Sequence, residues 1–336
     1  MMKNGSSKQN KYFRLFGLMA ALAILLSIAS PVYATRDILL PAGSNTVWHG
    51  VWLPIKRTIS SSAITTFESQ ANKKVGVELY YVGWYQNAWA DVQRQINVWE
   101  PMGIKAHVTW EPSLKSGGDP LAAILNGSQD AIINDFAVQS KAYGKPFFLR
   151  FAHEMNGNWY DWSGAMTGNN PQTYIDAWRY VWNKFQAAGA TNAVWVWSPN
   201  WNSVPNESWN DLHNYYPGDA YVDWVGVDFY GLKYDDVSVA ANIDAVYTSY
   251  SYKPIMIAET AAADCNNYVP GVTRTKDQWI NEFFATLLNR PAVRAFFWFN
   301  ENKNGEADWT ITSCPSPAAQ NAYQSGVGNA RYVTRP

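Results

Sequence analysis

The sequence predicts a single (β/α)8 TIM barrel of the α/β class, and three observations support this fold. Eight short runs of β-branched and aromatic residues recur along the chain, separated by segments with helical periodicity. The runs are continuously apolar, which is typical of parallel strands covered on both faces. About 300 residues follow the N-terminal segment, a normal length for one barrel.

Each strand is predicted from one apolar run. The eight ranges are Val47–Trp52, Val75–Val82, Ile104–Trp110, Pro146–Phe151, Ala193–Trp197, Val222–Phe229, Pro254–Ala258 and Arg294–Phe299. Helical periodicity is clear in three intervening segments, Leu121–Tyr143, Tyr174–Ala188 and Thr275–Leu288. Thr273 or Thr275 is the candidate N-cap of the last one. The sequence shows neither an internal repeat nor a linker, so we expect residues 35–336 to form one domain.

The first 34 residues have the pattern of a secretory signal peptide. A basic stretch ending at Arg14 precedes an apolar run from Leu15 to Ala29, and small residues at Val32 and Ala34 suit signal peptidase. The apolar run is short for a membrane-spanning helix. We therefore expect cleavage after Ala34, export of the mature chain, and no stable membrane insertion.

Charge and composition narrow the class of ligand. The predicted signal peptide contains four basic and no acidic side chains, so the mature chain has an excess of acidic residues. This balance disfavours nucleic acid as a partner. All 18 tryptophans follow Ala34, and flat aromatic side chains suit the C–H faces of sugar rings. A neutral polysaccharide is the ligand class that fits best.

The two cysteines, Cys265 and Cys314, follow the seventh and eighth predicted strands. In an exported chain an isolated pair indicates a disulfide. The four histidines are scattered and show no metal-ligand spacing with these cysteines. We expect neither a metal nor a cofactor, and we expect a monomer.

Two glutamates end strands on nearly opposite sides of the predicted barrel. Glu154 follows the fourth strand and Glu259 ends the seventh. Catalytic residues of TIM barrels lie at the carboxyl ends of the strands. Glycoside hydrolysis requires a carboxyl pair of this kind, about 5–5.5 Å apart when the anomeric configuration is retained. Glu154 and Glu259 are therefore the candidate catalytic pair.

The other strand ends are also polar or aromatic, as a carbohydrate cleft requires. They carry His49, Trp52, Trp84, Tyr85, Trp110, Glu111, Ser198, Asn200, Trp201, Asp228, Tyr230, Trp298, Asn300 and Glu301. Glu111 and Glu301 are rivals for either catalytic position, although neither lies in a recognisable acid/base segment.

The segment Arg150–Tyr160, with the sequence RFAHEMNGNWY, resembles the acid/base motif of glycoside hydrolase family 26. Ile257–Glu259 resembles the nucleophile segment of that family of retaining barrels. Shorter likenesses follow in the expected order at 197–200, 228–231 and 297–300. The resemblance extends over roughly Val47–Trp309. It implies a retaining hydrolase with Glu154 as acid/base and Glu259 as nucleophile.

The resemblance also implies roles for neighbouring side chains. Tyr230 is expected to donate a hydrogen bond to Glu259, and Arg150 to brace a carboxylate. His153 is expected near the sugar at the cleavage point, and Asn200 near a hydroxyl or Glu154. Trp159 and Trp298 are expected to stack on sugar rings, and Trp110 and Trp162 are further candidates for substrate contact or rim packing.

The sequence leaves the substrate open. The first hypothesis is an endo-acting hydrolase of β-1,4-mannan, the commonest activity of the family that the chain resembles. The alternative is a mixed-linkage β-1,3-1,4-glucanase, because Thr109–Pro112 looks closer to glucanase-like members. A non-catalytic polysaccharide-binding barrel and a transglycosylase are the remaining hypotheses.

Overall fold

The computed structural model describes residues 37–54, 60–85, 87–166, 168–266, 268–314 and 317–335. All of them belong to one unit, Arg36–Pro336. The predicted signal peptide lies outside the described residues. Within these ranges, no helix combines the length and apolar character needed to cross a membrane.

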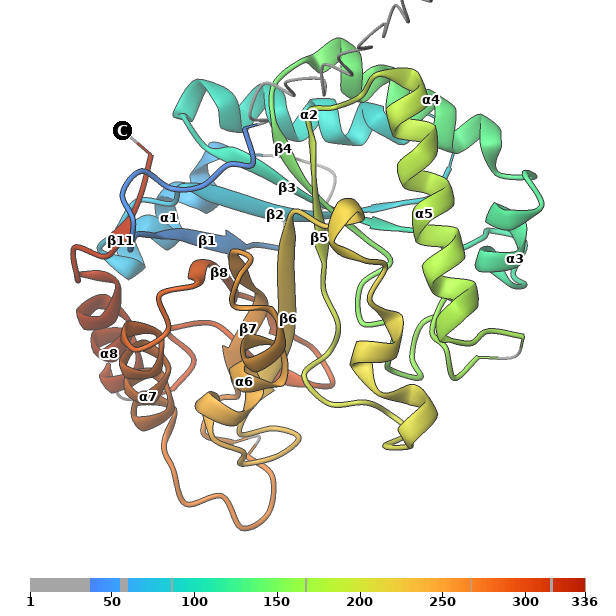
Figure 1. Ribbon diagram of the computed structural model, residues 1–336. Coiled ribbons are helices and arrows are strands. Elements are labelled where there is room, and N and C mark those ends of the chain that lie inside the picture. The colour runs from blue at the N-terminus through green and yellow to red at the C-terminus, as the bar shows by residue number, and fades with distance from the viewer. Residues whose placement is uncertain are drawn as a thin grey trace, which may run out of the picture. The chain divides into compact units, whose positions relative to one another are not determined.

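Eight parallel strands form a closed barrel, which confirms the predicted fold class (Figure 1). The strands are β1 (Val47–Trp52), β2 (Val77–Gly83), β3 (Lys105–Glu111), β4 (Phe147–Phe151), β5 (Ala193–Trp197), β6 (Trp224–Gly231), β7 (Ile255–Ala262) and β8 (Val293–Phe299). Each strand pairs with the next in sequence, and β8 pairs with β1. The two-residue strand β11 (Tyr332–Val333) extends the sheet beside β1. All eight predicted runs form strands, with ends shifted by only a few residues.

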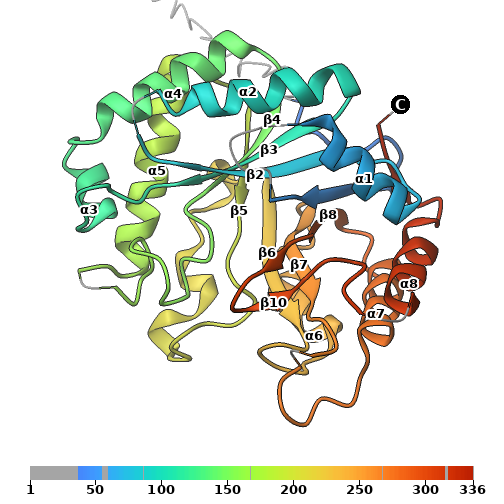
Figure 2. The ribbon, with the colours of Figure 1, turned by 180° about the vertical axis from the view of Figure 1, so that it is seen from behind.

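Helices surround the barrel in both views (Figures 1 and 2). They are α1 (Ser61–Ala71), α2 (Trp89–Trp99), α3 (Pro120–Leu125), α4 (Asp130–Tyr143), α5 (Pro171–Ala188), α6 (Val239–Tyr250), α7 (Lys276–Leu288) and α8 (Ala318–Val327). The helix predicted at Leu121–Tyr143 is two helices, because the chain turns at Gly127, whose φ is +79°. The N-cap of α7 is Thr275, which forms a capping box with Gln278.

The connection between β5 and β6 consists of short 3-10 helices at Ser208–Asn210, Leu212–Tyr215 and Asp219–Tyr221. Aromatic packing covers the outer face of β5 there. The ring of Trp197 lies edge-on to Tyr216 at 5.1 Å and to Tyr250 at 5.5 Å. The connection and the end of α6 together cover this end of β5 with buried aromatic rings.

Strand alternation divides the core into an inner and an outer part. Phe148, Trp224, Met256 and Phe297 belong to the cluster that fills the barrel interior. Their immediate sequence neighbours belong to the larger cluster between the strands and the surrounding helices. Apolar side chains fill the interior, while polar side chains at the carboxyl ends of the strands border a cleft. The barrel therefore presents its chemistry at one end only.

Candidate active site

A cleft of about 900 Å³ lies at the carboxyl ends of the strands and contains both predicted catalytic glutamates. Its lining combines aromatic rings with a few carboxylates and amides, as expected for a sugar-binding site. The lining residues are Trp52, Tyr81, Glu154, Trp159, Tyr160, Asn200, Trp201, Asn202, Val204, Tyr230, Tyr234, Asp235, Val237, Glu259, Phe299, Glu301, Lys303 and Glu306.

Glu154 lies in a tight turn directly after β4. Ala152 and Glu154 have φ values of +46° and +52°, a region that non-glycine residues rarely adopt. The backbone N–H of Glu154 donates to the carbonyl of Ser198 at 2.8 Å, which ties the turn to the end of β5. Backbone strain of this kind persists where the surroundings hold it, commonly at functional sites. Here it directs the Glu154 carboxyl into the cleft.

A β-bulge directs Glu259 toward the cleft. Met256 and Ala258 face the barrel interior, so simple alternation would turn the next residue, Glu259, outward. The register between β6 and β7 shifts instead: Val227 pairs with Ile257, and Asp228 pairs with Glu259. The extra residue reverses the alternation at this point. Glu259 consequently lies on the inner side with its carboxylate at the base of the cleft.

Three donors hold the Glu259 carboxylate. Tyr81 Oη donates to Oε1 and Tyr230 Oη donates to Oε2, each at 2.6 Å. Arg150 Nη2 donates to Oε1 as a charge-assisted bond. Burial, followed by the nearby charge of Glu259, raises the pKa of both tyrosines well above the usual value. Both phenols therefore keep their protons and remain hydrogen-bond donors to Glu259.

Arg150 is the buried centre of this arrangement. Besides Glu259, its guanidinium donates to Asp228 Oδ2 at 2.8 Å and to Thr109 Oγ1 at 2.9 Å. The side chains of Arg150 and Asp228 are both inaccessible to solvent. The planar guanidinium satisfies three acceptors on different strands, a geometry that lysine does not reproduce. Arg150 thus contacts the carboxylate from below and does not line the cleft.

Glu154 has a very different environment. Burial, followed by the charge of Glu259, raises the pKa of Glu154 from 4.5 to about 8. One hydrogen bond opposes this shift, since Trp159 Nε1 donates to Glu154 Oε2 at 2.7 Å. At neutral pH the Glu154 carboxyl is therefore mostly protonated. The two glutamates therefore differ in their surroundings: Glu154 accepts one hydrogen bond and has a raised pKa, whereas Glu259 accepts bonds from three side chains.

This difference predicts the alkaline limb of the pH profile. If protonated Glu154 donates to the leaving group, kcat/KM falls as pH rises through about 8, because the proton is lost there. Initial rates at low substrate concentration across a buffered pH series measure this limb. A rate that stays constant well above that pH would contradict the assignment.

Residues 83–286 match the sequence model of glycosyl hydrolase family 26. The chain belongs to glycosyl hydrolase family 26. The match contains both glutamates, Arg150 and Tyr230, and confirms the resemblance deduced from the Arg150–Tyr160 segment. Family 26 membership also fits the closed barrel with its glutamates on β4 and β7.

Relatives in the family have different names. Endoglucanase H of Acetivibrio thermocellus is 34% identical over 292 residues, which cover 83% of this chain and 30% of that protein. Mannan endo-1,4-beta-mannosidase of Bacillus subtilis is 29% identical over 150 residues, covering 43% of this chain and 37% of that protein. The chain therefore spans less than half the length of these curated relatives.

Solved structures of family 26 have the same fold. A modular endo-beta-1,4-mannanase from Cellulomonas fimi superposes with a TM-score of 0.65 at 18% identity, covering 87% of this chain and 72% of that one. A beta-mannanase from Bacteroides ovatus gives 0.63 at 16% identity, covering 87% and 91%. At these identities the likeness shows the shared barrel alone.

Among the predicted contacts, Trp159, Asn200 and Tyr230 line the cleft of this family 26 chain. Tyr230 donates to Glu259 as expected. The side-chain nitrogen of Asn200 donates to the carbonyl and side-chain oxygens of Asn202, at 2.9 and 2.8 Å. Asn200 is therefore held by its own loop, with its position in the lining open to a sugar hydroxyl.

His153 lies behind the cleft surface. Its Nε2 lies 3.0 Å from Tyr160 Oη and 3.9 Å from Glu259 Oε1. Burial, followed by the charge of Arg150, lowers the pKa of His153 well below 6.5, so the imidazole is neutral. Tyr160, in the same motif but given no role by the sequence, lines the cleft in its place. His153 is placed to orient Tyr160 and is not itself part of the lining.

Trp298, Trp110 and Trp162 are all buried and none of them lines the cleft, so Trp110 and Trp162 follow the packing alternative and Trp298 does not form the sugar-stacking wall expected of it. Trp298 and Trp110 sit on the outward-facing positions of β8 and β3. Trp298 Nε1 donates to the carbonyl of Trp309 at 3.0 Å, and Trp110 stacks on Phe136 at 4.3 Å. Trp162 stacks beneath Tyr160 at 4.2 Å and supports it.

The aromatic pair that lines the cleft includes the residue after Trp298 on β8. Phe299 lines the cleft and stacks on Trp52 with 4.1 Å between ring centroids and 10° between planes. Trp52 also meets Tyr81, a donor to Glu259, edge-on at 5.9 Å. From the sequence, Trp52 was expected at a strand end with no assigned role, and Tyr81 was not expected at the site. Both lie at inward-facing positions of their strands, so the alternation of inward and outward side chains along a strand is the signal that identifies them.

We expect Trp52→Ala to weaken substrate binding more than turnover. Loss of a stacking platform raises KM by about ten-fold, while Glu154 and Glu259 keep their hydrogen bonds. Steady-state kinetics on a soluble polysaccharide measure the change. Trp209→Ala is the matched control, because Trp209 is 45% exposed and does not line the cleft. An unchanged KM in the Trp52 variant would remove this platform from the site.

The rival glutamates are both near the cleft. Glu301 lines it, whereas Glu111 does not. Burial raises the pKa of Glu111 to about 7, partly offset by the charge of Arg150. Neither residue accepts the set of donors that surrounds Glu259.

The rim is also covalently linked: Cys265 and Cys314 form the predicted disulfide, with 5.7 Å between Cα atoms.

Across the described part of the chain, no group of three or more histidine, cysteine, aspartate or glutamate side chains has the arrangement of a metal site.

Proposed function

We propose that this chain is an endo-acting retaining β-glycanase, with Glu154 as acid/base and Glu259 as nucleophile. One observation carries the proposal. A carboxyl group with a raised pKa and a carboxylate held by three donors face the same aromatic cleft. Paired carboxyl groups in different protonation states are the requirement for glycosidic bond cleavage with retention.

In the first step, a Glu259 oxygen attacks the anomeric carbon and forms an ester bond with it. The bond from that carbon to the glycosidic oxygen breaks, and the leaving oxygen takes the proton from Glu154. Tyr81, Tyr230 and Arg150 fix the orientation of the attacking carboxylate beforehand. Their donor groups need little rearrangement as the charge on Glu259 decreases.

In the second step, the ionised Glu154 takes a proton from a water molecule, and the water oxygen attacks the anomeric carbon. The ester bond to Glu259 breaks, which restores its carboxylate and leaves the sugar with its original configuration. Glu154 again holds a proton. Its raised pKa suits both halves of the cycle, because a group that titrates near the working pH gives and takes a proton with similar ease.

For the substrate we propose a β-linked glucan first and β-1,4-mannan second. The support for glucan is the relative that matches 83% of this chain and is named an endoglucanase. The support for mannan is the relative named a mannosidase, which matches a shorter segment. The Thr109–Pro112 motif adds no support, because Trp110 is buried and Glu111 does not line the cleft.

Release of reducing sugar from barley-type mixed-linkage glucan and from galactomannan, measured side by side, tests the choice. We expect faster release from the glucan. A glucose and a mannose unit differ at one hydroxyl, and discrimination at one such contact is worth about 1–3 kcal/mol. Activity on galactomannan alone would reverse the order, and activity on neither would refute the proposal. Product sizes early in the reaction separate endo from exo action.

We further propose that the chain is exported and that residues 35–336 are the catalytic domain. The support is the basic and apolar pattern of the first 34 residues, together with the disulfide, which suits an oxidising compartment. N-terminal sequencing of protein recovered from the medium of an expressing culture should begin at Thr35. A start at Met1 would contradict cleavage.

A further inference from the structure

The loop after β8, residues 300–314, forms one wall of the cleft, and we call it the cleft-wall loop. It contributes three lining residues, Glu301, Lys303 and Glu306. Its short hairpin, β9 (Asn302–Lys303) paired with β10 (Ala307–Asp308), is bridged by an ion pair between Lys303 and Glu306 at 2.7 Å. Such a short hairpin is not stable alone. Contacts with the rest of the barrel must therefore hold it.

This loop also reaches the catalytic apparatus. The buried ring of Trp309 lies 4.9 Å from the ring of Tyr230, which donates to Glu259. The carbonyl of Trp309 accepts from Trp298 Nε1 at 3.0 Å. A shift of the cleft-wall loop would therefore alter the surface that faces the sugar and the packing behind one donor to Glu259.

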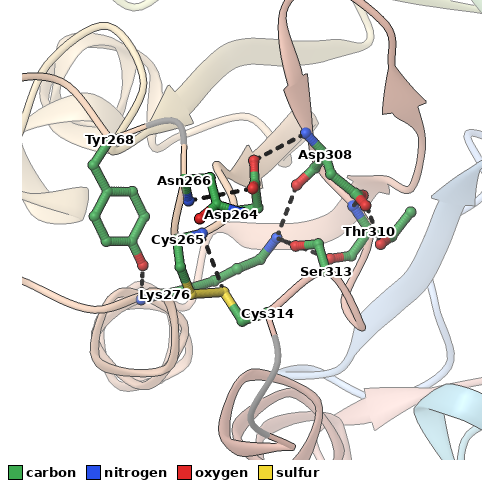
Figure 3. Close-up of a disulfide and its surroundings, with 9 residues drawn as sticks. All are labelled: Asp264, Cys265, Asn266, Tyr268, Lys276, Asp308, Thr310, Ser313 and Cys314. Carbon is green, nitrogen blue, oxygen red and sulfur yellow. Dashed lines mark hydrogen bonds between the residues drawn. A yellow bond between two sulfur atoms is a disulfide. The ribbon is translucent and has the colours of Figure 1, made fainter.

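A buried lysine at the start of α7 holds the loop (Figure 3). Lys276 Nζ donates to the carbonyl of Thr310 and to Ser313 Oγ, each at 2.8 Å, and more distantly to the carbonyl of Asp308 at 3.4 Å. Lys276 is only 1% exposed. All three acceptors belong to the cleft-wall loop, so the ammonium group uses its three donors on one segment.

Burial of this lysine is costly. Burial lowers the pKa of Lys276 from 10.5 to about 7, while the carboxylates of Asp308 and Asp264 favour the charged form. Lysines are almost never fully buried without partners. An apolar residue of similar length would fill the same space in the first turn of α7 without the desolvation cost. The lysine is therefore best explained by what its donors hold.

Two other contacts act on the same loop from the segment after β7. Asp264 Oδ1 accepts from the backbone N–H of Asp308 at 3.2 Å, and Cys265 is bonded to Cys314 (Figure 3). The disulfide restrains the end of the loop, 49 residues along the chain from its partner. From outside the loop, Lys276, Asp264 and Trp298 form hydrogen bonds with residues 308–313.

We propose that Lys276 is a positioning residue of the cleft: its ammonium group holds the cleft-wall loop where Lys303 and Glu306 face the substrate and Trp309 supports Tyr230. The proposal rests on the proposed glycanase function. Lys276 itself contacts neither the substrate nor the catalytic glutamates. Its effect is transmitted through the loop, and it should therefore appear mainly in substrate binding.

The test is Lys276→Met, which preserves the length and apolar stem of the side chain and removes its donors. We expect KM for the polysaccharide to rise about ten-fold, equivalent to about 1.4 kcal/mol, with kcat falling less than about three-fold. Lys184→Met is the matched control, because Lys184 pairs with Asp130 on the outside of α5. The control should keep the wild-type KM.

A purely structural role gives a different result. Partial unfolding of the variant would lower kcat through the fraction of active enzyme and leave KM unchanged, and that outcome would overturn the proposal. A second variant guards against misfolding of the first. Asp264→Ala removes the acceptor for the N–H of Asp308 and one of the two carboxylates that favour the charged form of Lys276. We expect its KM to rise as in Lys276→Met, and a wild-type KM in this variant would contradict the proposal.

The two proposals can fail separately. A wild-type protein that hydrolyses neither glucan nor mannan refutes the proposed function before any variant is compared. An active wild-type protein whose KM is unchanged by Lys276→Met refutes only the role of the lysine. Affinity electrophoresis in the soluble polysaccharide gives a readout that requires no turnover. It compares the binding of Glu154→Gln with that of the double variant Glu154→Gln/Lys276→Met. Weaker retardation of the double variant supports the proposal, and equal retardation contradicts it.

Discussion

Glu259→Ala is expected to lower kcat on a natural polysaccharide by at least about 10⁴-fold, because removal of a nucleophile eliminates the covalent path. The fold should survive the change. Arg150 keeps its bonds to Asp228 and Thr109, and water in the cleft can satisfy Tyr81 and Tyr230. Reducing-sugar assays measure the loss, and affinity electrophoresis should show that the variant still binds the polymer.

Added azide distinguishes this role from a general loss of structure. In the Glu259→Ala variant a small anion fits the space of the lost carboxylate and attacks the anomeric carbon, which gives a glycosyl azide with inverted configuration when the substrate has a good leaving group. Glu207→Ala is the control, because Glu207 is exposed and lies outside the cleft. Substantial wild-type-like turnover by Glu259→Ala would show that another carboxylate is the nucleophile.

Glu154→Ala is expected to lower kcat on a natural polysaccharide by about 10²–10⁴-fold, the usual contribution of general acid–base catalysis. The loss should depend on the leaving group. An aryl glycoside with an acidic phenol departs without protonation, so the first step stays fast and the glycosyl-enzyme accumulates. A burst of phenol followed by slow turnover, measured by absorbance, is the expected result.

Two further results would identify Glu154 as the acid/base. The fall in kcat/KM near pH 8 should disappear in the variant, because the group whose pKa sets that limb is absent. Azide should now attack the glycosyl-enzyme and give a product with retained configuration. Glu111→Ala is the informative control, since Glu111 also has a raised pKa, of about 7. If Glu111→Ala lost the alkaline limb and Glu154→Ala kept it, the acid/base would be Glu111 and not Glu154.

Much of the architecture is predictable from the sequence because its signals are local. Apolar runs identify all eight strands, and the capping pattern at Thr275 marks the start of α7. The prediction of a continuous helix through Asn126–Gln129 is wrong. The helical periodicity of the sequence continues through this segment, but the chain turns at Gly127. Glu154 and Glu259 were found because polar residues at strand ends converge on one end of a parallel barrel.

The side on which each strand-end residue lies was less predictable. Trp298 and Phe299 are adjacent, yet one is buried behind β8 and the other lines the cleft. The alternation of side chains along a strand explains this difference between Trp298 and Phe299. It would also have excluded Trp110 from the cleft. It fails at Glu259, where a bulge reverses the parity, and a bulge arises from pairing between β6 and β7. The contacts of Tyr81 and Lys276 also depend on pairing between distant segments, since their partners lie 178 and 32–37 residues away along the chain.

The sequence by itself therefore determined the barrel, the family and the two glutamates, since strand periodicity and a contiguous motif are properties of short segments. Only the tertiary structure decided which aromatic side chains line the cleft, which donors hold Glu259, and why the pKa of Glu154 is raised. Those properties depend on burial and on distances between residues remote in sequence, and neither exists until the strands have paired and the barrel has closed.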